Sequence, residues 1–474
     1  MSTKHSIAAE KFLSNPAKVT RHDQTFWSVR AKRDVLAYEL KEWEQLRDAA
    51  SNIKKHTVTH LADYLEEFER NATANGAIVH WAKDADEYND IVMQIMRQHS
   101  VKTVVKGKSM LTEECHLNEN LIHNGIDVVE TDLGERILQL MNLPPSHIIM
   151  PAIHITREQV KENFAEKGIL EKNGQQGAES MGCSDKTQLE AEADPTYLTR
   201  CARYHLRDNF MKAECGMTGA NFAIASTGEI VVCTNEGNAD MSTSCPKLHI
   251  AAIGLEKIIP DYDCLAVFQR MLCRAGTGQP TTTYTSHFRK ARPTAEPMHI
   301  ILVDNGRSEW ISNPEHWESL KCIRCGSCMN SCPVYRRSGG YSYSYFIPGP
   351  IGINLGMLRN PQKHSGNVSA CTLCNSCQTL CPVKVNLGDQ IYLWRQQLDE
   401  FGTANPQKKL MCKGMSVLYG SSGIYNAATA MAPMANLIPS PLMNLKLNPW
   451  AEGHKMMTFP KETFHAMWKK GKVK

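Results

Sequence analysis

The 474-residue sequence contains no run of 18 apolar residues, no block of basic residues and no apolar signal-like segment near its start. A helix that crosses a bilayer needs about 20 largely apolar residues, so we expect no transmembrane segment. Lysine and arginine are scattered and the formal net charge is +4, which argues against a nucleic-acid partner. Because no secretion signal is recognisable, we expect a cytoplasmic protein in a reducing compartment, long enough for two or three domains.

The usual nucleotide-binding loops are also missing. In "VVKGKSM", Lys102 stands where the first glycine of a phosphate-binding G-x-x-x-x-G-K-S loop would be. In "CRAGTGQPT", Thr281 replaces the third glycine of a dinucleotide fingerprint. The sequence therefore carries no flavin or nicotinamide motif.

His56 and His60 lie four residues apart without the glutamate of a zinc-binding H-E-x-x-H motif, so we expect solvated histidines.

One long segment, from Gly414 to Leu445, has no charged residue. Three glycines and three prolines interrupt it, which argues against a single membrane helix. We expect this segment to wrap around the protein as a buried C-terminal tail, with contact to a membrane or a partner as the alternative.

Hydrophobic periodicity divides the chain into four regions. Residues 1–75 are rich in helix formers and predict an amphipathic helical lead-in. Over residues 76–311, short apolar runs alternate with helical segments, which is typical of an α/β domain with a largely parallel sheet. A cysteine-rich domain follows over residues 312–400, and residues 401–474 form a C-terminal tail.

Five apolar runs of the α/β region are strand-like, at residues 77–81, 102–106, 126–130, 147–151 and 299–303. Two further runs around "STGE", within residues 220–235, predict a hairpin attached to that sheet. The sequence "TREQ" from Thr156 predicts a capping box at the start of a helix. The polar segment 171–196 has few bulky apolar residues and predicts a surface loop.

Seventeen cysteines in a chain expected in a reducing compartment indicate metal binding rather than disulfides. Eight of them form two runs 49 residues apart, "CIRCGSCMNSCP" and "CTLCNSCQTLCP", each with the pattern C-x2-C-x2-C-x3-C-P. Bacterial ferredoxins use this run, in which three closely spaced thiolates bind three irons of one cubane. Structural zinc usually takes two well-separated C-x2-C pairs, so the repeated run favours iron–sulfur clusters. The other cysteines are scattered, and we expect them to be small buried hydrophobes.

In two-cluster ferredoxins the fourth cysteine of each run binds the other cluster. The sequence therefore predicts two [4Fe–4S] clusters with crossed ligands: Cys322, Cys325, Cys328 and Cys381 for one, and Cys371, Cys374, Cys377 and Cys332 for the other. Since each iron would have its cysteine ligand, electron transfer is the direct interpretation, and a structural or redox-sensing role is the alternative. The 38 residues between the runs contain no obvious strand, which favours a mainly helical cluster domain.

Polar side chains follow several predicted strands, at the edge where open α/β sheets bind ligands. They give a set of candidate substrate-binding residues: Lys108, Ser109, Asp132, Glu135, Asn235, Glu236 and Asn238. Lys108 and Ser109 are suited to an anionic group such as a carboxylate. The alternative is that all these residues are loop caps and surface charges. The sequence identifies no catalytic residue.

Seven segments, in chain order, resemble the lactate utilization protein B family, the iron–sulfur subunit of a bacterial L-lactate utilization system: "VKGKSMLTEE", "VVETDLGERILQL", "PPSHIIMPAIH", "GMTGANFAIASTG", "TNEGN", "VDNGRSE" and "CIRCGSCMNSCPVYR". The resemblance extends over residues 20–400. It implies a sugar-isomerase/CoA-transferase-like α/β domain, the lactate-utilization domain, followed by a helical two-cluster ferredoxin domain. It also implies work with two companion subunits in oxidising L-lactate to pyruvate, as a non-catalytic or co-catalytic subunit of a cytoplasmic oxidoreductase.

Two other functions stay open at this point. The α/β domain would be a binding module for a carboxylate or an acyl-CoA, with clusters that sense redox state, or the complex would act on another 2-hydroxy acid such as glycolate. The chain also departs from the family pattern, because segment 171–196 is longer than expected and Ala220 stands in place of a cysteine. Neither departure affects a cluster cysteine.

Overall fold

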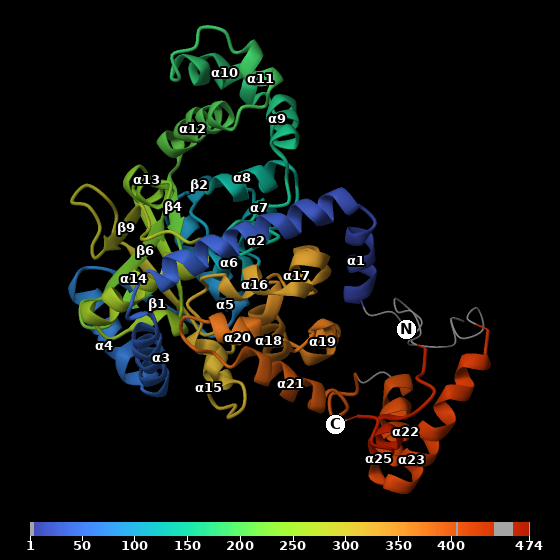
Figure 1. Ribbon diagram of the computed structural model, residues 1–474. Coiled ribbons are helices and arrows are strands. Elements are labelled where there is room, and N and C mark those ends of the chain that lie inside the picture. The colour runs from blue at the N-terminus through green and yellow to red at the C-terminus, as the bar shows by residue number, and fades with distance from the viewer. Residues whose placement is uncertain (1–3, 404–405, 440–457, 474) are drawn as a thin grey trace. The chain divides into compact units, whose positions relative to one another are not determined.

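The computed structural model describes residues 4–403, 406–439 and 458–473 (Figure 1). These residues form two compact units, one that ends at Leu398 and another that begins at Asp399. The larger unit contains, in chain order, a group of helices, a mixed α/β fold with a parallel sheet, and the cysteine-rich region, as the sequence predicts. No helix among the described residues is long and apolar enough to cross a membrane.

Four helices precede the first strand and confirm the predicted helical lead-in: α1 (Lys4–Leu13), α2 (Pro16–Tyr38), α3 (Trp43–Thr59) and α4 (Leu61–Ala74). The side chain of Asn15 caps α2. Phe26, in the middle of α2, is fully buried and contacts the rings of His147 and Tyr335. Helix α2 therefore lies beside segments that follow it by more than a hundred residues (Figure 1).

Six parallel strands form the central sheet, in the order β1-β10-β7-β4-β2-β3. Their bounds are β1 (Ile78–Ala82), β2 (Thr103–Lys106), β3 (Asp127–Glu130), β4 (Cys215–Thr218), β7 (Leu248–Gly254) and β10 (His299–Val303). Four of the five predicted runs are confirmed as β1, β2, β3 and β10. Sequence periodicity missed β4 and β7, the two central strands, because small residues such as Gly216, Ala251 and Ala252 occupy them. Both strands are buried along their whole length.

The fifth predicted run, residues 147–151, is not a strand. The Nδ1 atom of His147 accepts hydrogen bonds from the backbone N–H groups of Ile149 and Met150, both at 3.0 Å. This tight turn satisfies the backbone locally, so the segment needs no neighbouring strand. Ile148 is nevertheless buried, which explains why an apolar run without a strand occurs here.

A second sheet has the strand order β8-β5-β6-β9 and comprises β5 (Phe222–Ile224), β6 (Glu229–Thr234), β8 (Ile258–Ile259) and β9 (Tyr284–Phe288). Strands β5 and β6 are the predicted hairpin, with Phe222 opposite Val231. The hairpin belongs to this second sheet and does not extend the parallel one, which corrects the prediction. Gly228 in its turn has a φ of +69°, and a Cβ there would lie 2.2 Å from the backbone nitrogen of Ala72. Glycine thus lets the turn pack directly on α4.

Helices connect and cover the strands of the parallel sheet: α5 (Ala85–Gln98), α6 (Met110–Glu114), α7 (Leu117–His123), α8 (Leu133–Leu140) and α13 (Asn238–Ser244). Helix α14 (Tyr262–Gly276) joins β8 to β9 and contacts β5 of the second sheet. Between α5, α7 and the sheet lies one continuous buried cluster that includes Tyr88, Val92, Leu121 and Ile301. This core fixes the ends of the strands, from which the candidate ligand-binding loops project.

The segment predicted as a surface loop, residues 171–196, is largely helical. It overlaps α10 (Ile169–Glu179), α11 (Thr187–Ala191) and the start of α12 (Pro195–Lys212). The preceding helix, α9 (Arg157–Glu166), begins with the predicted capping box at Thr156. A Cβ at Gly177 would lie 2.8 Å from the Cys201 sulfur, and a Cβ at Gly174 would lie 2.6 Å from the Tyr197 hydroxyl. These glycines allow α10 to approach α12 closely, so the loop-like composition reflects helix packing.

Residues 312–398, all of which the structure describes, form helices and loops but no strand. The α-helices, beginning just before this range, are α15 (Arg307–Ile311), α16 (Ser327–Ser331), α17 (Pro333–Ser338), α18 (Gly349–Arg359), α19 (Pro361–Ala370), α20 (Ser376–Leu380) and α21 (Leu387–Gln397). Two 3-10 helices accompany them, η2 (Trp317–Lys321) and η3 (Gly340–Ser342). The one-turn helices α16 and α20 contact each other, and each carries the third cysteine of its run, Cys328 and Cys377.

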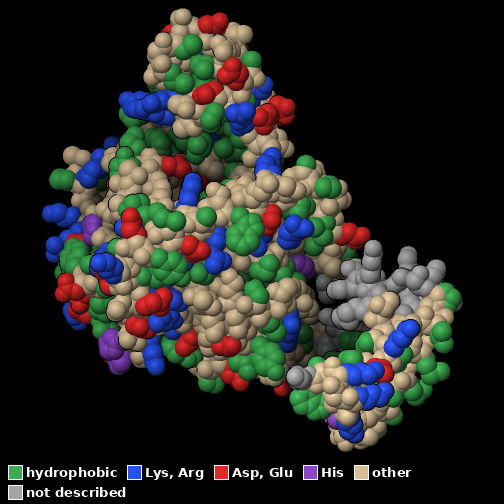
Figure 2. Space-filling model, in the orientation of Figure 1, with side chains coloured by type: hydrophobic (Ala, Val, Ile, Leu, Met, Phe, Trp, Pro, Cys, Tyr) green, Lys and Arg blue, Asp and Glu red, His purple; other side chains and the backbone are tan. Residues whose placement is uncertain are grey.

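The second unit contains α22 (Pro406–Gly420), α23 (Ser422–Met431), η4 (Ala432–Leu437) and α25 (Phe464–Lys469). Within this unit the described part of the charge-free segment is not buried, because Val417 and Leu437 are 63% and 81% exposed, and its expected wrapping around the rest of the protein stays a prediction. Hydrophobic side chains accordingly lie on its surface (Figure 2). Helices α22 and α23 end at Gly420 and Met431, and α23 has no buried residue. Residues 440–445 of the charge-free segment lie outside the described residues.

Candidate electron-transfer site and adjoining cavity

The two cysteine runs have the same backbone conformation. In the first run Arg324 has a φ of +59° and Gly326 a φ of +78°, and in the second run Leu373 and Asn375 have φ values of +53° and +56°. Residues other than glycine rarely adopt this left-handed backbone conformation, so its repetition at equivalent positions of the two runs indicates a shared functional geometry. In both loops the turn brings the first three cysteines together, as expected for ligands of one cluster.

Backbone N–H groups point at four of the cysteine sulfurs. Nitrogen-to-sulfur distances are 3.4 Å for Arg324 to Cys322, 3.3 Å for Leu373 to Cys371, 3.5 Å for Tyr335 to Cys332 and 3.3 Å for Val385 to Cys381. A donor of this kind favours a thiolate over a thiol, and hydrogen bonds to the sulfurs tune the potential of an iron–sulfur cluster. The first and fourth cysteines of both runs therefore stand in equivalent electrostatic surroundings.

The cysteines are grouped across the two runs. A small cavity with mainly apolar walls is lined by Cys322, Cys325, Cys328 and Cys381, and Cys332 of the first run does not line it. Burial raises the pKa of Cys381 to about 11, and the nearby Cys322 thiol adds to the rise.

The complementary grouping involves Cys332. Burial raises the pKa of Cys332 to about 11, and the Cys371 and Cys374 thiols of the other run contribute. Burial likewise raises the pKa of Cys377, with Cys332 the first thiol that contributes. The fourth cysteine of each run thus faces the first three cysteines of the other run.

The donors present suit iron–sulfur clusters. A [4Fe–4S] cubane takes one thiolate on each of four irons, so its ligands surround a cluster rather than one ion. Among the residues that the structure describes, no three Cys, His, Asp or Glu side chains converge as ligands of a single metal ion. The sets differ in accessibility, because Cys325 and Cys328 are buried whereas Cys374 is exposed.

Arginines of the helical lead-in contact the second run from outside. Arg47 of α3 donates from Nε to the Cys381 carbonyl at 3.0 Å and from Nη2 to the Thr379 carbonyl at 2.7 Å. Arg33 of α2 donates to the Leu380 carbonyl at 3.3 Å. The positive charge of these arginines compensates part of the negative charge of nearby cysteine thiolates. Sequence patterns gave no sign of this role, since both arginines lie more than 300 residues before their partners.

The first cysteine loop packs directly on the α/β region. Asn330 donates from Nδ2 to the carbonyl of Gly276, at the end of α14, at 2.8 Å, and its Oδ1 lies 2.9 Å from His147 Nε2. A Cβ at Gly276 would lie 2.6 Å from the Cys325 carbonyl oxygen. Burial lowers the pKa of His147 to about 3, so this imidazole is neutral and donates to Asn330. The turn at residues 147–151 and α14 therefore hold the loop against the sheet.

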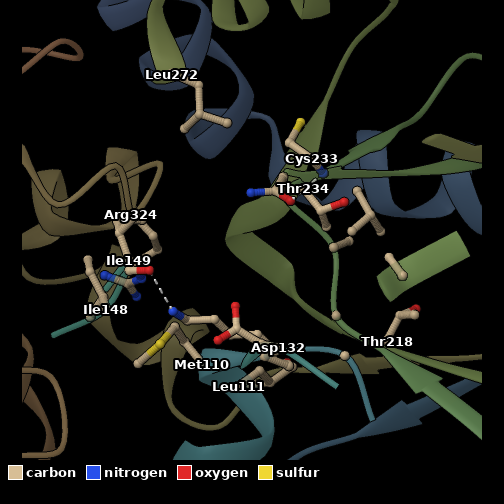
Figure 3. Close-up of a pocket in the computed structure, with 18 of the residues that line it drawn as sticks. Met110, Leu111, Asp132, Ile148, Ile149, Thr218, Cys233, Thr234, Leu272 and Arg324 are labelled. Carbon is tan, nitrogen blue, oxygen red and sulfur yellow. Dashed lines mark hydrogen bonds between the residues drawn. The ribbon is translucent and has the colours of Figure 1, made fainter. Parts of the chain in front are cut away.

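A cavity of about 270 Å³ lies at the ends of the parallel strands, between the sheet and the first cysteine loop. Its lining includes six of the seven candidate substrate-binding residues: Lys108, Ser109, Asp132, Asn235, Glu236 and Asn238. Arg324 and the cluster cysteine Cys325 line the same cavity. Figure 3 shows Arg324, Ile148 and Ile149 on one side of it and Thr218 and Thr234 on the other. The structure thus brings together residues that are distant in the sequence.

Glu135, the seventh candidate residue, does not line this cavity. It is buried in α8, and neither of its carboxyl oxygens has a hydrogen-bond partner. Burial and the nearby Glu130 raise the pKa of Glu135 well above its ordinary value, so we expect a neutral carboxyl group.

A buried ionic network forms part of the cavity wall, which includes Glu114, Glu256, Arg307 and Arg324. Arg307 pairs with Glu256, and its Nη2 lies 2.9 Å from Glu114 Oε2. Arg324 Nη2 lies 3.5 Å from Glu256 Oε1. The side chains of Arg307, Glu256 and Arg324 are at most 9% exposed. Sequence reasoning missed this network, because its members come from four segments that meet only in the folded chain.

Two carboxyl groups stand at the opposite end of the cavity, at the start of α8. Asp132 caps the helix and accepts from the backbone N–H of Glu135 at 3.0 Å, and Glu236 accepts from the backbone N–H of Leu133 at 3.1 Å. Burial and the nearby Asp132 raise the pKa of Glu236 to about 7. The helix terminus stabilises negative charge on both groups.

Comparisons with known proteins agree with this division of the chain. Residues 65–309 match the LUD domain family, and residues 318–385 match the 4Fe-4S dicluster domain family. Lactate utilization protein B of Bacillus cytotoxicus is 39% identical over 405 residues, which cover 84% of this chain and 81% of the relative. The protein of the same name from Exiguobacterium sp. is 37% identical over 443 residues, covering 92% and 90% of the two chains. The uncharacterized electron transport protein YkgF of Escherichia coli K12 is 35% identical over 453 residues, covering 93% and 91%.

Proposed function

The chain belongs to the lactate utilization protein B family, and we propose that it carries electrons through two [4Fe–4S] clusters in a complex that oxidises L-lactate to pyruvate. An iron–sulfur role in lactate utilization follows from the family and from the 4Fe–4S domain. The number of clusters, their ligands and the companion subunits are parts of the proposal.

The main observation in support of two clusters is the crossed grouping of the cysteines. Cys381 lines the cavity formed by the first three cysteines of the other run, and Cys332 faces Cys371 and Cys374. Each bound cluster would supply the transfer of one electron at a time. Two clusters that exchange their fourth ligands would be neighbours, and neighbouring clusters suit stepwise electron transfer.

The different exposure of the two sets supports a direction for this transfer. Cys325 lies on the wall of the cavity at the strand ends, and the set to which it belongs is largely buried. Cys374 of the other set is exposed. We therefore place the electron donor on the side of Cys325 and the exit to a companion subunit on the side of Cys374.

Protein groups would set the conditions for both clusters. Backbone N–H groups stabilise the charge on Cys322, Cys332, Cys371 and Cys381, and Arg47 adds positive charge next to the Cys381 carbonyl. Apolar side chains restrict water around the first set. Hydrogen bonds and positive charge raise the potential of a bound cluster, whereas exclusion of water lowers it, so these features together tune that potential.

Metal analysis and reduction by substrate together test the function. Protein purified without oxygen should hold about eight irons and eight acid-labile sulfides per chain. A Cys412→Ser variant is the matched control, since Cys412 is an exposed cysteine of the second unit and should leave both numbers unchanged. Addition of L-lactate with the two companion proteins should then produce the electron spin resonance signal of reduced clusters. Tightly bound zinc, or clusters that stay oxidised, would contradict the proposal.

A further inference from the structure

The size of the cavity beside Cys325 limits what it can hold. Its volume of about 270 Å³ is at the lower end of the range for ligand-binding pockets. It therefore suits a molecule of a few carbon atoms and is too small to enclose a dinucleotide. Because its wall includes both the strand-end loops and Cys325, a molecule inside would lie against the first cysteine loop.

Arg324 has an unused hydrogen-bond donor at this cavity. Its Nη2 is near Glu256, whereas its buried Nη1 has no hydrogen-bond partner in the structure. A buried guanidinium N–H without a partner is unfavourable, so it indicates a missing acceptor. Glu256 cannot supply it fully, since its carboxylate is shared with Arg307.

The second cysteine loop shows that this arginine is not needed for the loop itself. Leu373 stands at the equivalent position, with nearly the same φ and the same N–H to sulfur contact. A cluster loop of this conformation therefore forms with an apolar side chain. The charge of Arg324 instead serves the cavity that it lines.

A second cation stands close by. Lys108 lines the cavity, and its ammonium donates to the carbonyl of Ile149 at 3.1 Å, which leaves two of its three donors for a ligand. Figure 3 shows Arg324 and Asp132 on either side of this hydrogen bond. Arginine and lysine on one wall are suited to a carboxylate.

The other end of the cavity offers acceptors. Asp132 and Glu236 each use one carboxyl oxygen to accept a backbone N–H of α8, so each keeps a second oxygen. Thr234, on the neighbouring wall, has a buried hydroxyl without a hydrogen-bond partner. A ligand with a hydroxyl group a short distance from its carboxylate would satisfy both ends.

We propose that this cavity binds a small 2-hydroxycarboxylate, with its carboxylate on Arg324 and Lys108 and its hydroxyl donating to the Asp132–Glu236 pair. This deepens the proposed function and rests on it, because it places the substrate against Cys325 of the first cluster. The residues that select the substrate are then Arg324, Lys108, Asp132 and Glu236. The 2-hydroxyl and not only the negative charge is recognised.

Binding of such an anion should be coupled to proton uptake. The groups that face the Glu236 carboxyl are Asp132, Lys108 and the backbone N–H of Leu133. A bound carboxylate adds negative charge nearby and raises the affinity of Glu236 for its proton further. Above pH 7 the protein therefore takes up as much as one proton per ligand, and affinity falls by as much as about tenfold per pH unit.

Calorimetric titration of the full-length holoprotein under nitrogen tests the site. L-Lactate should bind at least about tenfold more tightly than propionate, which has the carboxylate but no 2-hydroxyl. The variant Arg324→Leu copies the second loop and should weaken both ligands about tenfold or more, with unchanged iron content. Lys108→Met gives an independent variant outside the cysteine loops, and Lys172→Met, an exposed lysine on α10, is its matched control.

The pH dependence gives a readout that a purely structural role would not change. Titrations in buffers of different ionisation enthalpy report the protons taken up, and Glu236→Gln should abolish both this uptake and most of the preference for L-lactate. Absence of L-lactate binding, equal affinity for propionate, or unchanged affinity in both Arg324→Leu and Lys108→Met would overturn the inference. If lactate reduces the clusters in the presence of the companions yet does not bind here, the proposed function stands and this site is wrong. If lactate binds here but the protein holds no iron, this site stands and the proposed electron-transfer function is wrong.

Discussion

Arg324 and Leu373 occupy the same position of two cysteine loops, with φ values of +59° and +53°, yet only Arg324 lines the cavity at the strand ends. The backbone of the loop is thus duplicated while the side chain is not. One loop is specialised toward the α/β region, and the other is the more exposed.

Gly326 and Asn375 form the first matched test. Both have a positive φ, but a Cβ at Gly326 would lie 2.9 Å from Ile149 Cγ1, whereas Asn375 already carries a side chain. We expect Gly326→Ala to lower the free energy of unfolding by about 1 kcal/mol or more and to reduce iron content. Asn375→Gly should leave both nearly unchanged. Chemical unfolding under nitrogen, with metal analysis, measures the difference, and equal effects of the two changes would contradict this account.

The buried pair of Glu256 and Arg307 should dominate acid sensitivity in the α/β region. Burial alone would raise the pKa of Glu256, but Arg307 and Arg324 outweigh it and hold the pKa below its ordinary value. The resulting stability is fully present above about pH 4.5 and is lost as the pH falls below that value.

We therefore expect Glu256→Gln to destabilise the protein by about 3 kcal/mol at pH 7, since it leaves Arg307 buried without a full partner. The loss relative to the unchanged protein should shrink on acidification below pH 4.5. Unfolding free energies measured at pH 7 and at pH 4 check both statements. A loss that is constant with pH would show that the Glu256 charge is not involved.

Arg47 should influence the potential of a cluster. The change Arg47→Met removes a positive charge and two hydrogen bonds next to Cys381, so the affected midpoint potential should become more negative by tens of millivolts. Arg270→Met is the control, because Arg270 also binds the lead-in, through Glu42, but contacts no cysteine carbonyl. A redox titration followed by electron spin resonance distinguishes them. Identical potentials in all three proteins would rule out this role for Arg47.

Oxygen should attack the two clusters in a fixed order. Cys374 is exposed while Cys325 and Cys328 are buried, so the cluster assigned to Cys374 should be lost first in air. Iron content should then fall from about eight toward four before the remainder is lost. Timed alkylation and mass spectrometry should find Cys371 and Cys374 labelled early. Early labelling of Cys328 would reverse the assigned order.

Local sequence patterns predicted the features that local physics determines. The cysteine spacing specifies a turn regardless of what surrounds it, and the runs 78–82, 103–106, 127–130 and 299–303 are strands because β-branched residues favour them. The same reasoning failed at residues 147–151, where the side chain of His147 satisfies the backbone that a strand would otherwise need to pair. It also failed at Gly174 and Gly177, whose partners on α12 are invisible in a linear pattern.

The candidate cavity was predictable only in part. Strand-end loops placed Lys108, Asp132 and Glu236 at one edge of the sheet, and these do line the cavity. Arg324 could not be assigned, since the sequence shows it merely as a spacer between two cysteines. Its relation to Glu256 depends on the docking of the cysteine loop against the sheet, which no local pattern encodes.

The crossed assignment of the cluster ligands is the central claim, and selective alkylation of a Cys332→Ala variant tests it most directly. Under nitrogen, the variant should lose the cluster assigned to the second run, so that Cys371, Cys374 and Cys377 become alkylated while Cys322, Cys325 and Cys328 stay protected. The reciprocal change Cys381→Ala should expose the first three cysteines and protect the others. Labelling of Cys322, Cys325 and Cys328 in the Cys332→Ala variant would contradict the account.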